Sequence, residues 1–331
     1  MILAGDIGGT KTNLAYFRLT DRKIRPDGVA SYPSRDFGSL EEVVEKFRAS
    51  HPAEITAAAF GVAGPVVDGR TEATNLSWIV DSRSVARQLG LQQVGLINDL
   101  QATAYGILQL NDEDKLVLNK GVPDKGGTIG IIAVGTGLGQ CALLWDGRQY
   151  RAMASEGGHS DFAPRNELEI EILRFMKRDL ARVSYERVLS GPGLRNLYRF
   201  FRSKAGYPEP EWLTKAMAEN DPSATISDAA LQGKDNACAQ ALETFVALYG
   251  AETGNIALKF LATGGVFVGG GIAPKIITKL SEGPFLQAFL DKGRYSPLLS
   301  KMPVSVVLND KTALFGAAQY ALMLQTGSLV L

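Results

Sequence analysis

The 331-residue chain lacks most features of secreted or membrane-spanning proteins. It has only two cysteines, Cys141 and Cys238, which lie far apart in apolar segments. Such a pair provides neither a disulfide framework nor the spacing of a metal site, and it suits a reducing cytosol. No apolar run approaches the roughly 18 residues of a membrane span, and the first residues do not resemble a signal peptide. We therefore expect a cytoplasmic protein without a membrane partner.

An excess of charge of one sign is also missing. Lysine plus arginine and aspartate plus glutamate number 35 each. The balance gives no overall attraction to nucleic acid or to an anionic membrane, so we expect neither as a partner. A chain of this length can bury a large core and is typical of two domains rather than one.

Glycine, in contrast, is frequent at informative places, first in a turn near the N-terminus. An apolar run ends at Asp6, passes through Gly8 and Gly9 and becomes apolar again, which predicts strand, tight turn and strand. Paired glycines let backbone N–H groups approach an anion, and Thr10 and Thr12 add hydroxyl donors. Asp6 is placed to hold Mg²⁺, directly or through water. A hairpin that merely needs glycine explains the same pattern, so this stretch alone leaves two interpretations.

The same pattern recurs around Gly135, Thr136 and Gly137. At a constant offset, five residues of the first stretch match five of the second: Ile2, Ala4, Gly8, Leu14 and Tyr16 correspond to Ile131, Ala133, Gly137, Leu143 and Trp145. The repeat predicts two related halves, each with a phosphate-binding turn, that hold a nucleotide between them. It favours anion binding for the first turn as well.

Three further stretches carry candidate ligand-binding residues. Asn98 and Asp99 end a short buried strand, where open α/β sheets bind ligands, although both residue types also cap helices and position alone slightly favours the cap. Residues 264–272 form a strand with five glycines, which favours close approach of a flat ligand ring. By itself, the polar loop 155–162 is typical of a solvated loop. In the turn 184–189, Glu186 is by itself typical of an acid in a first helical turn, where the helix dipole favours negative charge.

The pattern of caps and apolar periodicity predicts the remaining main elements. Strands are expected at 56–62, 94–99 and 304–308, and helices at 40–50, 82–89, 100–108, 166–177, 194–203, 236–249, from there toward 261, and at 312–324. The charged segment 111–127 is expected to cross between domains.

Six motifs carry a resemblance to a known family. They are, in order, Gly5-Asp6-x-Gly-Gly-Thr10, Asn98-Asp99, Gly135-Thr136-Gly137-x-Gly139, Glu156-Gly-Gly-His159, Glu186-Arg-Val-Leu-Ser-Gly-Pro-Gly193 and Gly264-Gly-Val-Phe-Val-Gly-Gly-Gly271. With these motifs the chain resembles bacterial-type glucokinases of the actin-like, hexokinase-related ATPase superfamily. The resemblance implies an α/β, two-domain actin-like ATPase (ribonuclease H-like) fold with a ligand cleft between the domains, and a homodimer. The implied small domain is 1–108 plus 312–331, and the implied large domain is 109–311.

The implied activity is ATP-dependent phosphorylation of D-glucose to glucose 6-phosphate, feeding glycolysis, with Mg²⁺ as cofactor. Expected ATP-binding residues are Asp6, Gly8, Gly9, Thr10, Lys11, Gly135, Thr136, Gly137, Gly270 and Gly271. By resemblance, sugar-binding residues are Asn98, Asp99, Glu156, His159 and Glu186. Asp99 is expected to take the proton from the 6-hydroxyl of glucose. For Lys11, a solvated loop lysine is an equally good interpretation.

Two departures and three alternatives accompany this resemblance. A related group of sugar kinases has a cysteine-rich zinc motif after the histidine of its sugar loop, whereas this chain has no cysteine between 142 and 237, so no structural zinc is expected. The segment 61–75 differs from the enterobacterial pattern, so the resemblance defines the floor of the sugar pocket better than its rim. The alternatives are a kinase for another hexose, a non-catalytic sugar-sensing protein of the same fold, and an actin- or chaperone-like nucleotide switch.

Overall fold

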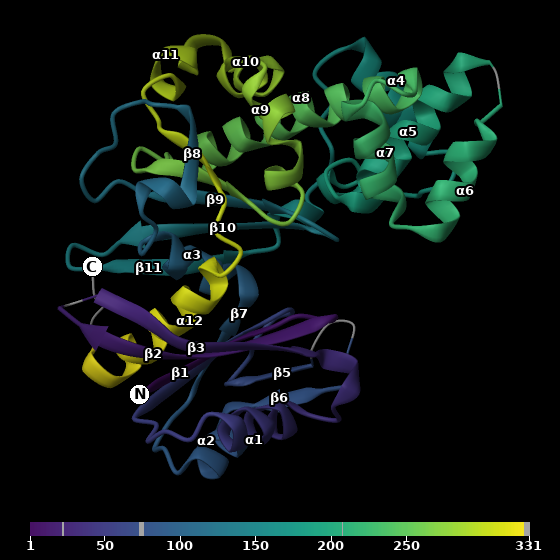
Figure 1. Ribbon diagram of the computed structural model, residues 1–331. Coiled ribbons are helices and arrows are strands. Elements are labelled where there is room, and N and C mark those ends of the chain that lie inside the picture. Colours follow the sequence, from purple (N-terminus) through teal and green to yellow (C-terminus); the bar gives the residue numbers. More distant parts are fainter. Residues whose placement is uncertain (22, 73–75, 207, 328–331) are drawn as a thin grey trace. The chain divides into compact units, whose positions relative to one another are not determined.

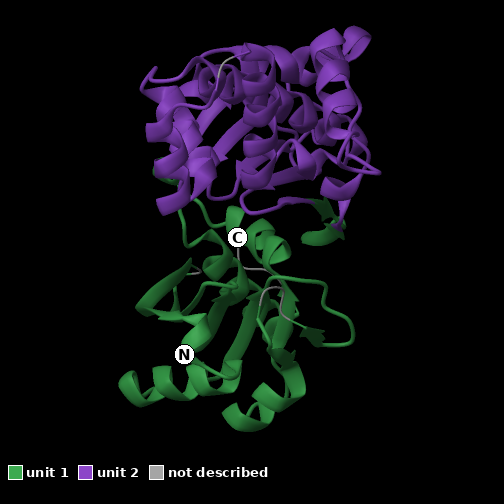
Figure 2. Ribbon diagram, turned by 90° about the vertical axis from the view of Figure 1, so that its right-hand side faces the viewer, with its two compact units in different colours: residues 1–115, 141–154, 309–331 green, residues 116–140, 155–308 purple. Residues whose placement is uncertain are grey.

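The computed structural model describes residues 1–331 except 22, 73–75, 207 and 328–331. The end of the segment 61–75 and the end of the final stretch 312–331 therefore lie outside the described residues. The chain forms two compact units, coloured separately in Figure 2. Unit 1 comprises residues 1–115, 141–154 and 309–331, and unit 2 comprises 116–140 and 155–308. Both units contain strands and helices, as the predicted α/β class requires.

A five-stranded sheet organises unit 1, in the order β3-β2-β1-β4-β7. Its strands are β1 (Ile2–Ile7), β2 (Lys11–Thr20), β3 (Lys23–Pro33), β4 (Ala57–Val62) and β7 (Gly95–Asn98). Strands β1 and β2 are antiparallel neighbours, which confirms the predicted first hairpin, and β4 runs parallel to both β1 and β7. A separate pair, β5 (Arg70–Glu72) and β6 (Ile79–Asp81), was not predicted.

Alternation along the strands divides the core of unit 1 between the two faces of this sheet. On β1, Leu3 and Ile7 pack with α1 (Leu40–Ser50) and α2 (Ser82–Leu89), while Ile2 and Ala4 pack with α12 (Thr312–Thr326). Successive strand residues point to opposite faces, so an apolar run covered on both sides is expected for this strand. The helices near the N-terminal sheet are labelled in Figure 1.

Helices α1 and α2 begin at caps that the sequence predicts. Ser39 accepts a hydrogen bond from the Glu42 N–H at the start of α1, and Asp81 accepts one from the Arg83 N–H at the start of α2. Gly90 ends α2 in the left-handed conformation that glycine adopts without strain. The remaining helix of the α type is α3 (Asp99–Ile107). Short 3-10 turns lie at Ser34–Asp36, before α1, and at Asp112–Asp114, after α3.

The second sheet repeats the strand order of the first. Its order is β11-β10-β9-β12-β13-β8. If the strands of each sheet are numbered along the chain, starting from β1 in the first sheet and from β9 in the second, both sheets have the order 3-2-1-4-5. The strands are β8 (Lys115–Asn119), β9 (Ile129–Val134), β10 (Leu138–Trp145), β11 (Tyr150–Ser155), β12 (Gly265–Gly269) and β13 (Val304–Val307). The shared order supports the two related halves that the glycine turns predict. Strand β8 occupies part of the segment expected to be only a crossing.

Unit 2 contains most of the helices. They are α4 (Glu167–Met176), α5 (Gly191–Ala205), α6 (Glu211–Glu219), α7 (Pro222–Leu231), α8 (Asn236–Lys259), α9 (Ile277–Ser281), α10 (Pro284–Leu290) and α11 (Ser296–Leu299). Short 3-10 turns lie at Gly157–His159, Tyr185–Arg187, Ala273–Ile276 and Gly293–Tyr295. Helices α4 to α7 lie together beside one end of α8 (Figure 1).

Two helix predictions in unit 2 were wrong at their ends. Helix α5 begins at Gly191 rather than at Leu194, because Ser190 caps it and Pro192 is tolerated in a first turn, where its missing N–H costs no helical bond. Helix α8 is one continuous helix and does not break near Gly250. A Cβ at Gly250 would lie 2.0 Å from the carbonyl oxygen of Phe285, so this glycine permits close packing of α10 rather than ending the helix.

Candidate active site

Polar residues of unit 1 collect at the carboxyl ends of parallel strands. In the sheet register Asp6 of β1 lies beside Gly61 of β4, and Val62 of β4 lies beside Asn98 of β7. Only β4 separates the ends of β1 and β7, so Asp6 and Asn98 reach the same edge of the sheet. This is the edge at which α/β sheets bind ligands.

Asn98 is a helix cap, as one of the two sequence interpretations states. Its Oδ1 accepts from the Leu100 N–H at 2.9 Å, and its Nδ2 donates to the Gly64 carbonyl at 3.1 Å. These bonds fix the side chain and leave the second amide hydrogen for another partner. Asp99 is the first residue of α3, and its Oδ1 also accepts from Leu100 N–H, at 2.8 Å. A carboxylate at a helix N-terminus is stabilised in its charged form.

Asp6 stands in a different environment. Burial raises the pKa of Asp6 to about 6, and the nearby negative charge of Asp99 acts in the same direction, while a hydrogen bond from Asn13 opposes both. The Asn13 Nδ2 lies 3.4 Å from Asp6 Oδ2. A cation bound beside Asp6 would favour its ionised form.

The first glycine turn is closed by its own backbone. The Gly8 N–H donates to the Lys11 carbonyl at 2.9 Å, and Thr10 and Lys11 are exposed. Thr12 is fully buried, and its hydroxyl is 3.0 Å from the Ser34 hydroxyl. The suggestion that Thr12 donates to an anion is therefore wrong, because strand alternation turns its side chain into the protein.

The second glycine turn borders a cavity of about 850 Å³ in unit 2. Gly135, Thr136 and Gly271 line this cavity among the residues expected to bind ATP. A Cβ at Gly135 would lie 4.0 Å from the Gly271 N–H nitrogen, so the two glycine segments face each other. Pockets for ligands of moderate size occupy about 300–1,000 Å³, a range that includes this one.

Gly137 and Gly270 do not line the cavity, and both have structural reasons to be glycine. A Cβ at Gly137 would lie 2.7 Å from Glu186 Oε2. Gly270 has a φ of 85° and lies against the backbone of Val134, where a Cβ would be 2.3 Å from the carbonyl oxygen. The other expected ATP residues, Asp6 to Lys11, belong to unit 1.

Sequence reasoning missed most of the cavity wall. Its further lining includes the N-terminal turns of two helices and three basic side chains: Gly191, Pro192, Arg195 and Arg199 of α5, Asp221 to Ala224 at α7, and Lys275. Both helix starts have a recognisable signal, because Ser190 and Asp221 are each capping residues followed within two residues by proline. The first was missed, because the helix there was expected to begin only at residue 194.

The structure brings together the two segments expected to bind sugar in unit 2. The His159 Nδ1 lies 3.9 Å from Glu186 Oε1, and Glu186 Oε2 accepts from the Leu138 N–H at 3.0 Å. The side chain of His159 is 54% exposed and that of Glu186 is 28% exposed, so both can reach a ligand. Gly158 packs against the Leu138 carbonyl, where a Cβ would be only 1.9 Å away. Glu156 and His159 thus begin and end a turn pressed against the start of β10.

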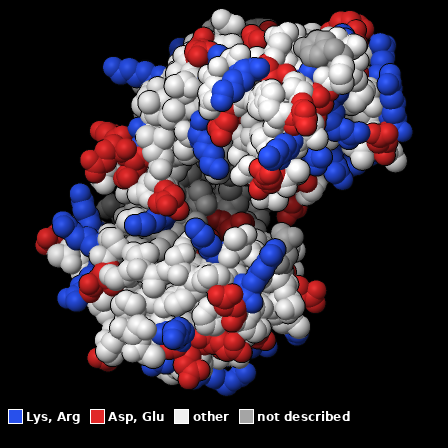
Figure 3. Space-filling view, turned by 45° about the vertical axis from the view of Figure 1, so that its right-hand side comes forward, with Lys and Arg blue, Asp and Glu red and all other residues white. Residues whose placement is uncertain are grey.

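Neither a metal cluster nor a membrane segment occurs in the part of the chain that the structure describes. No group of three or more histidine, cysteine, aspartate or glutamate side chains is arranged to hold a metal ion there. Of the described helices, none combines the length and the apolar character needed to cross a bilayer. Basic and acidic side chains are interspersed on the face shown in Figure 3, in keeping with the balanced charge.

Two sheets of one strand order, each with a glycine turn between its first strands, define a two-domain ATPase of the actin-like, hexokinase-related class. The structure is similar to a crystal structure of glucokinase from an Antarctic psychrotroph, with a TM-score of 0.87 and 30% identity over 97% of this chain and 98% of that one. A family model described as Glucokinase matches residues 3–324. The chain belongs to the glucokinase family.

Curated relatives agree with this family. The chain is 44% identical to a glucokinase of a Nostoc species over 96% of this chain and 98% of the relative. It is also 44% identical to a glucokinase of a Synechocystis species, with 96% of each chain covered. The identification of the sequence as a bacterial-type glucokinase is thereby confirmed.

Proposed function

We propose that the protein transfers the γ-phosphoryl group of ATP to the 6-hydroxyl of D-glucose and forms ADP and glucose 6-phosphate. The observation that carries this proposal is the meeting of Glu186 and the Glu156–His159 turn at the start of β10, in a chain of the glucokinase family. Carboxylates accept hydrogen bonds from sugar hydroxyls, and an imidazole can both donate and accept. These groups suit a neutral polyhydroxylated substrate.

The cavity in unit 2 is the proposed adenosine site. Its volume fits a nucleoside, and it is lined by Thr136, the first turn of α5 and Gly271. The N-terminal turns of α5 and α7 line the cavity, and the positive end of a helix dipole favours phosphate oxygens. The glycine turn of unit 1, with Gly9, Thr10 and Lys11, is proposed to complete phosphate binding.

Asp99 is the proposed general base. The O6 atom attacks the γ-phosphorus as Asp99 accepts the O6 proton, the new O6–P bond forms, and the bond from phosphorus to the β–γ bridging oxygen breaks with release of ADP. Asp99 stands at the start of α3, where the helix dipole favours the carboxylate that can accept this proton. Asn98, fixed by its cap and by Gly64, is proposed to bind a sugar hydroxyl with its remaining amide hydrogen.

Asp6 fits the requirements of a magnesium ligand. Mg²⁺ is usually bound by one or two carboxylates together with substrate phosphates and water, rather than by a cage of protein side chains. Asp6 offers one such carboxylate, and burial together with the negative charge of Asp99 raises its pKa to about 6. When bound, Mg²⁺ would neutralise charge on the β- and γ-phosphates.

The proposal also covers the domain bounds, the assembled form and the location of the protein. The small domain is proposed to be 1–108 plus 312–331 and the large domain 109–311, with a homodimer as the assembled form. A cytoplasmic location is supported by the use of ATP and by the two cysteines, which are free and buried.

A coupled ADP-release assay across a panel of hexoses tests the substrate. We expect the highest kcat/KM with glucose, lower values with mannose and fructose, and only background release without sugar. A higher kcat/KM with another hexose would reassign the substrate. Glucose binding without ADP release from any hexose would instead indicate a sugar-sensing protein.

A further inference from the structure

A buried carboxylate lies behind the two proposed sugar-binding segments of unit 2. Glu252, in the middle of α8, has no solvent exposure. Its Oε1 accepts from Gln140 Nε2 at 2.8 Å, and its Oε2 accepts from Asn255 Nδ2 at 2.7 Å. The Lys259 Nζ lies 3.6 Å from Oε1 and supplies positive charge. Because burial of an ionised group is costly, a core that needed only stability would gain little from this arrangement.

One arm of the network reaches the Glu156 turn. Gln140 is 2% exposed, and its bond to Glu252 turns its Oε1 the other way, toward Gly157. A Cβ at Gly157 would lie 2.3 Å from that oxygen, so the backbone directly after Glu156 packs against the Gln140 amide. The position of Glu156 thus depends on the orientation of Gln140.

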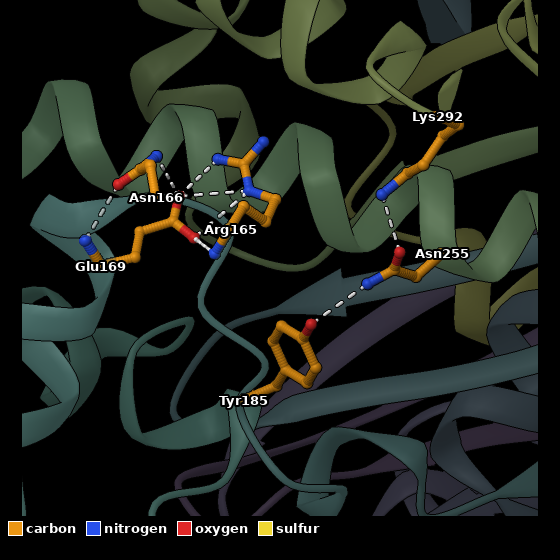
Figure 4. A network of polar contacts seen from close by, with 6 residues as sticks. All are labelled: Arg165, Asn166, Glu169, Tyr185, Asn255 and Lys292. Atoms are coloured by element: carbon orange, nitrogen blue, oxygen red, sulfur yellow. Dashed lines mark hydrogen bonds and ion pairs between the residues drawn. The ribbon is translucent and has the colours of Figure 1, made fainter. Parts of the chain in front are cut away.

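The other arm reaches the Glu186 turn through Asn255. The Asn255 Nδ2 donates its second hydrogen to the Tyr185 hydroxyl at 3.1 Å, and its Oδ1 accepts from Lys292 Nζ at 2.7 Å. Figure 4 shows Lys292, Asn255 and Tyr185 joined in this order. Burial and the charge of Glu252 raise the pKa of Tyr185 to about 12, which keeps the phenol protonated. Tyr185 directly precedes Glu186 in the chain.

We infer that Glu252 is a positioning residue for glucose, which holds the Glu156–His159 turn through Gln140 and the Glu186 turn through Asn255. The inference rests on the proposed function, because it assumes that these turns bind the sugar. Glu252 itself touches no substrate. Its effect is to fix two segments, far apart in sequence, at one spacing in unit 2.

The test is Glu252→Gln, which preserves shape but replaces one acceptor oxygen with an NH₂ group facing a donor. We expect glucose kcat/KM to fall about 10- to 100-fold, as when supporting hydrogen-bond partners of a site are lost. Equilibrium glucose binding, measured by calorimetry without ATP, should weaken in parallel, while the KM for ATP changes little. A merely structural role would not separate the two substrates in this way.

Asp235→Asn is the matched control. Asp235 is a buried carboxylate on the same helix, where it caps the N-terminus and pairs with Arg202. The same change of carboxylate to amide should leave the KM for glucose unchanged, whatever its effect on Tm. If Asp235→Asn weakens glucose binding as much as Glu252→Gln, or if the KM values for ATP and glucose rise together, the inference is overturned.

A second variant keeps the test decisive if Glu252→Gln does not fold. Gln140→Met has similar size and removes only the arm that reaches Gly157. A folded Gln140→Met protein with wild-type glucose KM would contradict the inference. Failure of the proposed function is recognised separately, because the wild-type protein would then release no ADP with glucose.

Discussion

At the scale of single residues, one side chain can have a structural and a chemical role together. Asn98 caps α3 and is bonded to Gly64, yet these bonds leave one amide hydrogen for a ligand. Asp99 is the first residue of the same helix, close enough to Asp6 for its charge to raise the pKa of that carboxyl. A helix cap and a ligand-binding residue are therefore compatible interpretations of this pair.

The change Asp99→Asn should abolish most of the turnover. General-base catalysis contributes about 10²- to 10⁴-fold, so we expect kcat to fall by at least about 10²-fold, with a much smaller change in glucose affinity. Asparagine keeps the size of the side chain and suits a helix start, so circular dichroism should show a folded protein. Steady-state kinetics with saturating ATP measures the effect.

Two further variants are compared with Asp99→Asn, one as a control and one at a proposed sugar contact. Asp112→Asn removes a fully exposed carboxylate of unit 1 that pairs with Lys115, and it should leave kcat unchanged. Glu156→Gln removes a proposed sugar contact and should raise the KM for glucose more than it lowers kcat. Near-normal turnover in Asp99→Asn would refute the assignment of the base.

At the scale of elements, glycines within helices permit contacts rather than end the helix. In α8, Gly250 lies under the carbonyl oxygen of Phe285 and Gly254 under that of Phe289, both in α10. In unit 1, a Cβ at Gly316 of α12 would lie 1.7 Å from the Ala102 carbonyl oxygen of α3. The absence of a side chain at this position lets α12 pack closely against α3.

The change Gly250→Ala should destabilise the protein although alanine is the better helix former. Helix propensity alone would favour alanine by about 1 kcal/mol. A Cβ 2.0 Å from a backbone oxygen forces α8 and α10 apart, and overpacking of this kind typically costs about 1–3 kcal/mol. We expect a net loss in the free energy of unfolding, measured by urea denaturation.

The control lies on the exposed face of the same helix. Gln240→Ala also introduces alanine into α8 and should change the free energy of unfolding by no more than about 0.5 kcal/mol. A Gly250→Ala protein more stable than wild type would show that α10 moves aside freely.

At the scale of the whole molecule, the two sheets share one strand order and the two units divide the proposed chemistry. Unit 1 contributes the carboxylates Asp6 and Asp99, and unit 2 contributes the cavity and the turns with Glu156 and Glu186. Gene duplication explains the shared order economically, since each half keeps a glycine turn between its first two strands. Only the second half has the inserted helices α4 to α8 between its third and fourth strands.

Metal dependence is a prediction about the complete protein. Exhaustive chelation should abolish activity, and added Mg²⁺ should restore it fully, because the ion is needed only with the nucleotide. Metal analysis of the purified protein should find no zinc in stoichiometric amount. Zinc at one equivalent per chain, or activity that Mg²⁺ does not restore, would contradict this expectation.

The sequence by itself determined the local features and the family. Caps at Ser39, Asp81 and Asn166 and the glycine turns are short-range signals, since each depends on bonds between residues close in the chain. The same is true of the motifs that identify a glucokinase. The exception at Gly250 concerns a glycine whose neighbour, Phe285, is remote in sequence. The start of α5 at Gly191, in contrast, has a local signal in the Ser190 cap, which the sequence-based prediction missed.

Only the tertiary structure decided which distant residues meet. The cavity wall joins Thr136 to the starts of α5 and α7, and the buried network joins Gln140, Tyr185 and Glu252. Such contacts leave no periodicity, because each partner is a single polar residue within an otherwise apolar or ordinary segment. The motifs of the chain therefore indicate the residues proposed to bind the substrates, and the fold adds those proposed to hold them in place.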